Sequence, residues 1–283
     1  VENPAGTEQP LPTAQPTRPA YPPGTLVEYT AQMGDTLPAV AAHFNTTEAE
    51  IRAANSILPE HVTTLPAGLP MQIPIYYEPF WGSPFQILPD SLFINGPAQV
   101  GFDVVAFVND QPGWLKNASQ YVAEEQRRGG EIIDYYATTY SISPRLLLAL
   151  IEYLAGGLTQ PETPDGKEIY PLGYVERFHQ GLARQLNWVS NELNNGYYDW
   201  RTGKLESYEL QDGRLERPDP WQNAATVTLQ NYFAQVLPPD AYTLAISGEG
   251  LIKTYTQLFG DPWSNLQAHI PGSLEQPAFR FPF

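Results

Sequence analysis

Residues 27–44 read VEYTAQMGDTLPAVAAHF, and three local patterns follow one another in this stretch. The first five residues alternate in the manner of a short strand. Gly34, Asp35 and Thr36 then break the alternation. Apolar side chains recur at helical spacing after the break, at Leu37, Val40, Ala41 and Phe44. The stretch therefore predicts a strand, a tight loop and a helix.

Residues 45–75 continue as NTTEAEIRAANSILPEHVTTLPAGLPMQIPI and complete a small unit. Ile51 and Ala54 have helical spacing, and Thr46 or Thr47 is placed to cap this second helix. A turn at residues 65–68 leads into residues 71–75, which have the composition of a strand. The order strand, helix, helix, strand predicts an α+β module at residues 26–76.

The motifs of this module resemble the LysM family. That family has Tyr-Thr-Val, Gly-Asp-Thr-Leu, a small-residue helix ending near Phe, Ile-x-x-x-Asn, and Leu-x-x-Gly before the closing strand. The matching segments here are Tyr29-Thr30-Ala31, Gly34-Asp35-Thr36-Leu37, Ala41-Ala42-His43-Phe44, Ile51-Arg52-Ala53-Ala54-Asn55 and Leu65-Pro66-Ala67-Gly68. The resemblance implies a module that binds N-acetylglucosamine-containing glycan, either peptidoglycan or a chitin-like polymer.

The resemblance also implies where the glycan binds. In the LysM family, the loop before the second strand forms one wall of a shallow sugar groove, and the start of the first helix forms the other. The implied glycan-binding residues are Gly34, Asp35, Thr36 and Leu37 on one side, and Ser56, Ile57, Leu58 and Pro59 on the other. Exposed amides at the helix start would donate to an acetamido carbonyl. The alternative is that Asp35 and Thr36 only cap the helix.

Three segments outside the two expected domains have the composition of connectors. Residues 1–25 are rich in Pro, Thr and Gln, which predicts a flexible tether, with an arm that docks on a neighbouring subunit as the alternative. Residues 77–101 are rich in Pro, Gly and aromatic residues and are expected to be an ordered linker, with sugar stacking as a lesser option. Residues 266–283 are expected to be an exit linker.

Residues 102–265 have a helical pattern and predict a mainly α-helical domain. Ser143 and Pro144 are placed to start a helix that Gly156-Gly157 ends, and its apolar run predicts a central, buried position. Asp212-Gly213 predicts a β-hairpin. The other expected helices are residues 131–140, an amphipathic helix with Leu182 to Leu193 that Gly196 ends, residues 224–236 capped by Asn223, and residues 251–259 before Gly260.

The central helix resembles that of lysozyme-like lytic transglycosylases. In that family, a proline opens the helix and Glu-Ser-Gly follows ten residues later. Here Pro144 and Gly156 occupy the expected places, but Leu154 stands at the Glu position and Ala155 at the Ser position. Leucine cannot transfer a proton, and Glu152 is displaced by about 200° around the helix. The resemblance therefore implies a catalytically degenerate lysozyme-like domain, and no catalytic residue is assigned.

Composition excludes several other function classes. The 15 basic and 31 acidic residues give a net charge of −16, which argues against nucleic acid as a partner. The chain has no Cys, and its four His residues show no zinc-ligand spacing, so no metal or other cofactor is expected. Glu162, Asp165 and Glu168 could form a functional carboxylate pair, but a solvated acidic loop is the simpler interpretation. No segment is long and apolar enough to span a membrane.

The order of domains resembles the N-terminal part of bacterial LysM-containing lysostaphin-type zinc endopeptidases, without the peptidase domain. We therefore expect an extracellular cell-wall-binding protein, present as a mature chain from which a signal peptide has been removed. The first alternative is an active peptidoglycan hydrolase or the non-catalytic front half of a wall endopeptidase. The second is a structural protein that assembles with other cell-surface subunits.

Overall fold

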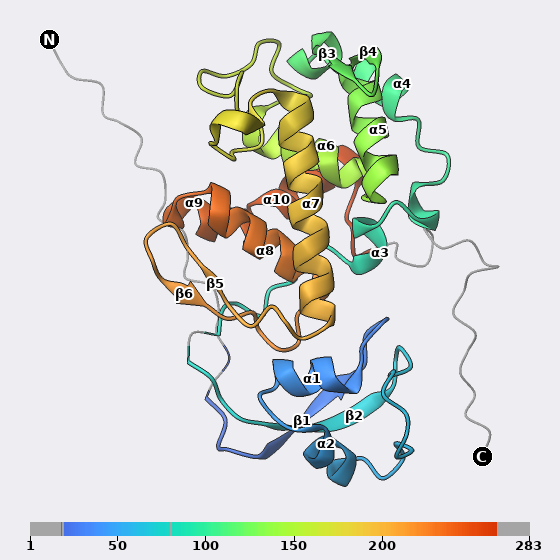
Figure 1. Ribbon diagram of the computed structural model, residues 1–283, viewed down its shortest axis with the longest axis vertical. Coiled ribbons are helices and arrows are strands. Elements are labelled where there is room, and N and C mark those ends of the chain that lie inside the picture. The colour runs from blue at the N-terminus through green and yellow to red at the C-terminus, as the bar shows by residue number, and fades with distance from the viewer. Residues whose placement is uncertain (1–17, 19, 80, 265–283) are drawn as a thin grey trace, which may run out of the picture.

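The protein has two units, each built around its own apolar core (Figure 1). The structure is a computed structural model that describes residue 18, residues 20–79 and residues 81–264. The predicted exit linker at 266–283 and most of the predicted tether at 1–25 lie outside the described residues. The smaller unit is a βααβ module at residues 25–75, and a helical domain stands above it.

The βααβ module follows the order expected from its sequence. Its elements are β1 (Thr25–Thr30), α1 (Leu37–His43), α2 (Glu48–Ala54) and β2 (Pro70–Ile75). The two strands pair antiparallel, with Val27 opposite Ile73. Thr47, one of the two predicted caps, starts α2 in a reciprocal pair of hydrogen bonds with Glu50. The α+β prediction is confirmed.

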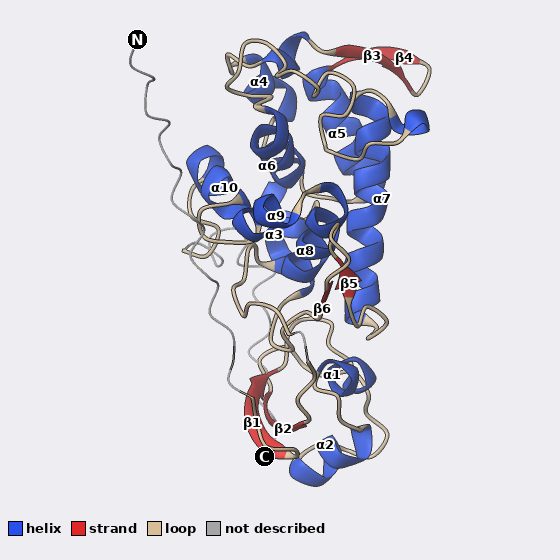
Figure 2. Cartoon of the chain, turned by 90° about the vertical axis from the view of Figure 1, so that its left-hand side faces the viewer, coloured by secondary structure: helices blue, strands red, loops and turns tan. Residues whose placement is uncertain are grey.

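The helical domain is built mainly from α-helices, with two short β-hairpins. Its α-helices are α3 (Asp90–Phe93), α4 (Val104–Asn109), α5 (Gly129–Tyr140), α6 (Pro144–Ala155), α7 (Leu182–Arg201), α8 (Ala224–Val236), α9 (Pro239–Ala245) and α10 (Leu251–Phe259). The hairpins pair β3 (Ser119–Val122) with β4 (Glu125–Arg128), and β5 (Tyr208–Glu209) with β6 (Leu215–Glu216). Short 3-10 helices lie at Pro97–Gln99, Trp114–Asn117 and Arg177–His179. Figure 2 shows α6 between α5 and α10, and it contacts both of these helices.

Helix α6 is the central helix, as its sequence predicts. Six consecutive side chains, residues 146–151, are fully buried. The Ser143 hydroxyl accepts a hydrogen bond from the Leu146 amide, and Pro144 occupies the first turn. Gly156 ends the helix with a φ of 59°, which is in the left-handed region that glycine adopts at little cost.

The prediction that Gly196 ends the amphipathic helix is wrong. Helix α7 continues past Gly196 to Arg201. The glycine allows close packing instead, because a Cβ at this position would lie 2.6 Å from the Thr228 Oγ1 of α8. This close approach brings α7 and α8 together. The C-terminal end of α7 reaches the βααβ module (Figure 1).

Asn223 lies at the N-cap position of α8, as predicted, but its side chain does not form the capping bond. The side chain donates instead to the Leu88 carbonyl and to Asp90. Asp90, from α3, caps α8 in its place, since its Oδ1 accepts a hydrogen bond from the Ala225 amide at 2.8 Å. Residues on both sides of Asp90 are buried in the helical core, so the second half of segment 77–101 packs within the helical domain.

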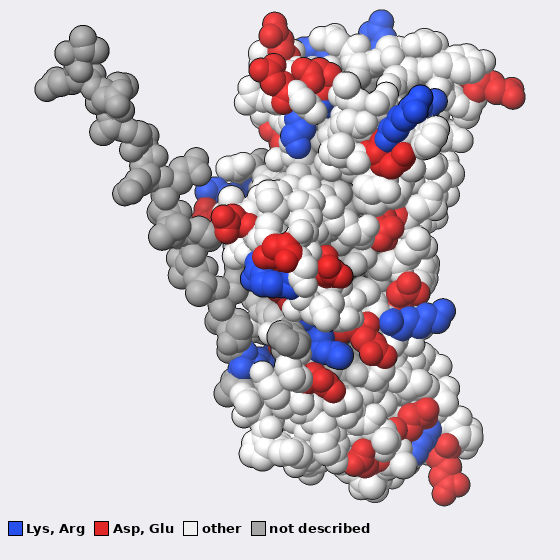
Figure 3. Space-filling view, turned by 60° about the vertical axis from the view of Figure 1, so that its left-hand side comes forward, with Lys and Arg blue, Asp and Glu red and all other residues white. Residues whose placement is uncertain are grey.

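Charged side chains are interspersed on the face of the molecule shown in Figure 3. Acidic groups lie beside basic ones over most of this face, with a gathering of acidic groups at its upper end. Among the described residues, none of the helices has both the length and the apolar character needed to cross a bilayer.

Candidate functional site

The loop before α1 forms the first wall of the expected groove. Gly34 has a φ of 85° and is exposed, so the chain reverses there without side-chain obstruction. Asp35 does not cap the helix. Its Oδ2 accepts the Tyr29 hydroxyl at 2.5 Å and the Gln32 amide at 2.7 Å, which closes the loop on itself. Burial raises the pKa of Asp35, while these two hydrogen bonds act in the opposite direction.

Thr36 both caps α1 and leaves one donor available. Its hydroxyl accepts the Ala39 amide at 3.4 Å, so the capping interpretation is right for this residue. Thr36 pairs with Thr64 in an isolated antiparallel bridge. The two hydrogen bonds of this bridge come from the neighbouring residues: the Leu37 amide donates to the Thr63 carbonyl, and the Leu65 amide donates to the Asp35 carbonyl. In such a bridge the amide of the central residue points outward. Within the described part of the chain, the Thr36 amide has no acceptor.

Leu37 contributes differently from the other residues of the first wall. Its side chain is fully buried in the module core, and its amide is bonded to the Thr63 carbonyl at 2.6 Å. Leu37 therefore fixes the position of the loop and presents no side chain to a ligand.

The second wall, residues 56–59, lies in the loop between α2 and β2. Ser56, Ile57 and Pro59 are exposed, and the Ile57 side chain is 60% exposed. Leu58 packs against the module core. Arg52 holds the loop by donating to the Pro59 carbonyl at 2.6 Å and to the Val62 carbonyl at 2.7 Å. The loop is therefore fixed in place with an apolar side chain presented to solvent, as a binding surface requires.

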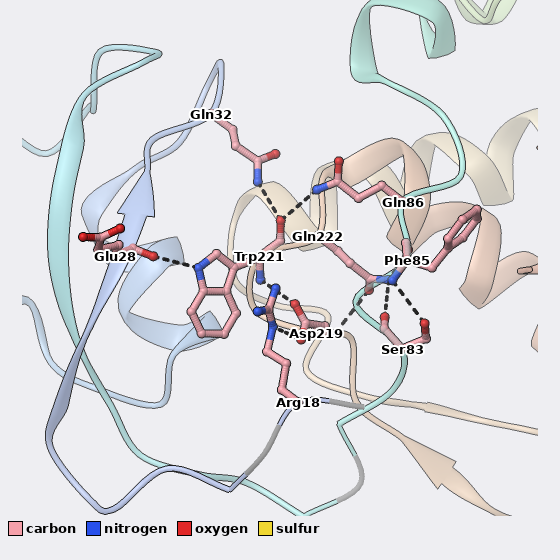
Figure 4. A network of polar contacts seen from close by, with 9 residues as sticks. All are labelled: Arg18, Glu28, Gln32, Ser83, Phe85, Gln86, Asp219, Trp221 and Gln222. Atoms are coloured by element: carbon pink, nitrogen blue, oxygen red, sulfur yellow. Dashed lines mark hydrogen bonds and ion pairs between the residues drawn. The ribbon is translucent and has the colours of Figure 1, made fainter. Parts of the chain in front are cut away.

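A tryptophan from the helical domain joins the two units (Figure 4). The Trp221 indole donates to the Glu28 carbonyl of β1 at 2.9 Å, and its ring packs edge-on against Phe44 with 4.8 Å between ring centroids. Gln32 and Gln86 both donate to the Trp221 carbonyl at 3.1 Å. We call this contact region between the βααβ module and the helical domain the seam.

Arg18 covers the outer side of the same tryptophan (Figure 4). Its guanidinium lies 3.9 Å from the centre of the Trp221 ring and pairs with the buried Asp219 carboxylate at 2.7 Å. Burial raises the pKa of Asp219, and the Arg18 charge opposes this shift. This described end of the N-terminal segment therefore packs on the seam.

The C-terminal end of α7 makes the second half of the seam. The rings of His43 and Trp200 stack with 3.6 Å between centroids, and the His43 Nε2 lies 2.8 Å from the Trp200 carbonyl. The next residue, Arg201, lies over the groove wall, since a Cβ on Gly34 would be 1.8 Å from its Nη2. Local sequence patterns do not single out Trp221 or Arg201, because their partners lie far away in the chain.

The region expected to resemble a transglycosylase site has no acid at the expected position. Leu154 is partly buried against the helical core, and Ala155 is buried. The Glu152 carboxylate instead accepts hydrogen bonds from the segment that follows α6. Its Oε2 accepts the Leu158 amide at 2.7 Å and the Thr159 amide at 3.2 Å, and its Oε1 accepts the Thr159 hydroxyl at 2.5 Å.

The acidic loop after α6 is solvated. Glu162, Asp165 and Glu168 are all exposed. Glu162 and Glu168 line one hollow of about 530 Å³, together with Lys167, whose pKa is lowered by burial. Exposed carboxylates of this kind have no environment that would set one apart as a general acid.

The chain matches two protein families. Residues 29–74 match the LysM domain, and residues 86–272 match the family described as "LasA, N-terminal domain". Over 185 residues, the chain is 26% identical to Protease LasA in two strains of Pseudomonas aeruginosa. No solved structure gives a significant match.

The alignment with the protease covers 63% of this chain and 39% of the protease, so the chain spans about two fifths of the curated relatives it matches. A LysM domain implies binding to peptidoglycan or a chitin-like glycan, and with it an extracellular or cell-wall location. Since the second family match covers most of the chain, the chain belongs to the LasA N-terminal domain family and carries a LysM domain ahead of that family's domain.

Proposed function

We propose that this chain is the wall-binding, non-catalytic part of a protease-related cell-wall protein. The LysM domain binds the glycan in the groove between residues 34–37 and 56–59. The observation that carries this proposal is the outward-pointing Thr36 amide, which has no acceptor among the described residues and stands beside the exposed Gly34. An acetamido carbonyl is the matching acceptor on N-acetylglucosamine.

Ile57 supplies the apolar side of the groove in this proposal. Sugar rings bind to apolar side chains through their C–H faces, and Ile57 is 60% exposed on a loop that Arg52 holds in place. The contact area is small, so binding of a single LysM domain is expected to be weak, on the order of micromolar to millimolar.

The helical domain is proposed to hold the LysM domain and the glycan without cutting the glycan. The resemblance of the central helix to lytic transglycosylases puts Leu154 at the position of their general acid. The Glu152 carboxylate accepts hydrogen bonds from two backbone amides and a hydroxyl. General acid catalysis contributes about 10² to 10⁴ to the rate of such cleavage. A domain without a positioned acid is expected to release no soluble muropeptides from purified wall.

The experiment that tests the groove is co-sedimentation of the full chain with purified peptidoglycan sacculi. Ile57→Ala should lower the bound fraction several-fold, because it removes exposed apolar contact without disturbing the core. The matched control is Leu26→Ala, which truncates a side chain of the same domain that is 54% exposed on β1. Equal binding by both variants and the unmodified chain would remove Ile57 from the site, and no binding by any of them would refute the proposal.

A further inference from the structure

A second hollow lies at the seam, beside the first wall of the groove. It has a volume of about 580 Å³ and is lined by both units. The LysM domain contributes Tyr29, Gln32 and Met33, and the helical domain contributes Gln86, Asp90 and Trp263. We call this hollow the seam cleft. Because its walls come from two units, it exists only where they are joined.

The polar groups of the seam cleft are mainly acceptors. Gln32 and Gln86 each use Nε2 to bond the Trp221 carbonyl, and Figure 4 shows their side-chain oxygens turned away from that bond. Asp90 adds a carboxylate whose Oδ1 is held by the Asn223 side chain and the Ala225 amide, both at 2.8 Å. No Lys or Arg belongs to the described lining.

Asn223 is itself an unpartnered group in the lining. Its residue is 7% exposed, and its Oδ1 has no hydrogen-bond partner among the described residues. Its Nδ2 donates to the Leu88 carbonyl at 2.7 Å and to Asp90, which fixes the amide orientation and makes Oδ1 the unpaired atom. This oxygen is itself shielded from solvent, and an unpaired buried acceptor costs free energy.

These groups fit a neutral ligand that is rich in donors. Sugar hydroxyls and an acetamido N–H would donate to the Gln32 and Gln86 oxygens. The partly exposed Trp263 indole offers a flat face for a sugar ring. Acidic stem peptides fit less well, because Asp90 would repel their carboxylates. The chemistry of the lining therefore favours an N-acetylated sugar over a peptide.

The seam cleft and the LysM groove meet at consecutive residues. Met33 lines the cleft, and Gly34 begins the first groove wall. Arg201 lies over Gly34, and its charge acts on both Asp35 of the groove and Asp90 of the cleft, so the two sites are close in space as well.

We propose that the seam cleft is a second subsite for an N-acetylated sugar, reached by a glycan strand that continues out of the LysM groove. This inference rests on the proposed function, since the groove must hold the strand first. It extends that function by giving the helical domain a direct contact with the glycan. The chain would then prefer long oligosaccharides to short ones.

The test is calorimetric titration of the full chain with N-acetylglucosamine oligomers of two to six sugars. The hexamer should bind at least about tenfold more tightly than the dimer, because it fills both sites. Trp263→Ala should weaken hexamer binding about five- to tenfold and leave dimer binding unchanged. Trp263→Phe retains an aromatic face and should keep most of the affinity. Phe178→Ala, which truncates an exposed aromatic residue outside the cleft, is the matched control.

Tryptophan emission provides a second readout. Residues 34–37 and 56–59 contain no Trp, whereas Trp221 and Trp263 line the cleft. The hexamer should therefore change the emission, and the dimer should not. Equal affinities for dimer and hexamer, or a Trp263→Ala variant that binds hexamer normally, would overturn the cleft as a sugar subsite while leaving the groove intact. Preferential binding of muropeptides over the matching peptide-free glycan would assign the cleft to stem peptide instead. If the unmodified chain does not bind the dimer, the LysM groove itself is not a glycan site, and the proposed function fails.

Discussion

Two neighbouring residues of the Gly-Asp-Thr-Leu motif, Asp35 and Thr36, have different structural roles. Asp35 and Thr36 are both candidates for a helix cap by residue type, with Asp the stronger of the two. Thr36 takes that role, while Asp35 accepts hydrogen bonds from Tyr29 and Gln32. The difference follows from the loop, since the bridge between Thr36 and Thr64 turns the Thr36 amide outward. The donor proposed for the glycan therefore depends on a backbone pairing that the motif alone does not describe.

Glu152→Gln should destabilise the fold by about 1–2 kcal/mol, because an amide accepts the two backbone N–H bonds less strongly than a carboxylate. Thermal unfolding measures this change. Neither the unmodified chain nor the variant should release muropeptides from purified wall. Release by the unmodified chain that the substitution abolishes would make Glu152 catalytic and contradict the structural role.

At the scale of elements, Gly196 shows how a packing requirement can override helix propensity. Gly196→Ala should favour α7 by about 1 kcal/mol on propensity. The new Cβ would lie 2.6 Å from Thr228 Oγ1 and 3.3 Å from its Cα, so overpacking of about 1–3 kcal/mol should dominate. We expect a lower unfolding temperature.

Thr228→Ala in the Gly196→Ala background provides the control for this contact. Removing the hydroxyl should restore part of the lost stability, although Thr228→Ala alone removes a bond to the Leu193 carbonyl. A Gly196→Ala chain that unfolds at a higher temperature than the unmodified protein would show that the two helices separate easily.

The elements that could be predicted are those with local causes. Thr47, Ser143 and Gly156 determine helix ends through neighbouring residues, and the predicted hairpin at Asp212-Gly213 is present. The cap of α8 could not be predicted, since it comes from Asp90, 135 residues before Ala225. Likewise, Trp221 bonds Glu28 across 193 residues, and no local pattern marks such a pair.

At the scale of the whole molecule, the seam joins the LysM domain to the helical domain through packed contacts at two places. Trp221 packs against the LysM core, and Trp200 stacks on His43 of α1. Separate domains linked by a flexible segment would have neither contact. The arrangement holds the groove at a fixed position relative to the helical domain.

The seam should make stability depend on pH through His43. Burial lowers the pKa of His43 to about 4 from an ordinary value of 6.5. The contribution of the buried, neutral His43 ring to the free energy of unfolding is therefore fully present above pH 6.5. It is lost as the pH falls toward 4. Between pH 7 and pH 4.5 this loss is about 2 kcal/mol. Thermal unfolding across this range measures it.

His43→Phe separates this effect from other titrating groups. Asp35, Asp90 and Asp219 have raised pKa values, so their protonation on acidification acts in the opposite direction in both proteins. The variant keeps a ring against Trp200 and should lose less stability on acidification than the unmodified chain. Identical pH dependence in the two proteins would exclude His43 as a cause.

The central claim is that the groove between residues 34–37 and 56–59 binds N-acetylglucosamine-containing glycan. The most direct test of this binding is a nuclear magnetic resonance titration of the full chain with a short N-acetylglucosamine oligomer, in which the chemical shifts of the backbone amides are followed. We expect the Thr36 amide and those of residues 56–58 to shift in a saturable manner, with a dissociation constant on the order of micromolar to millimolar. Shifts confined to other residues, or no shift at millimolar oligomer, would contradict the account.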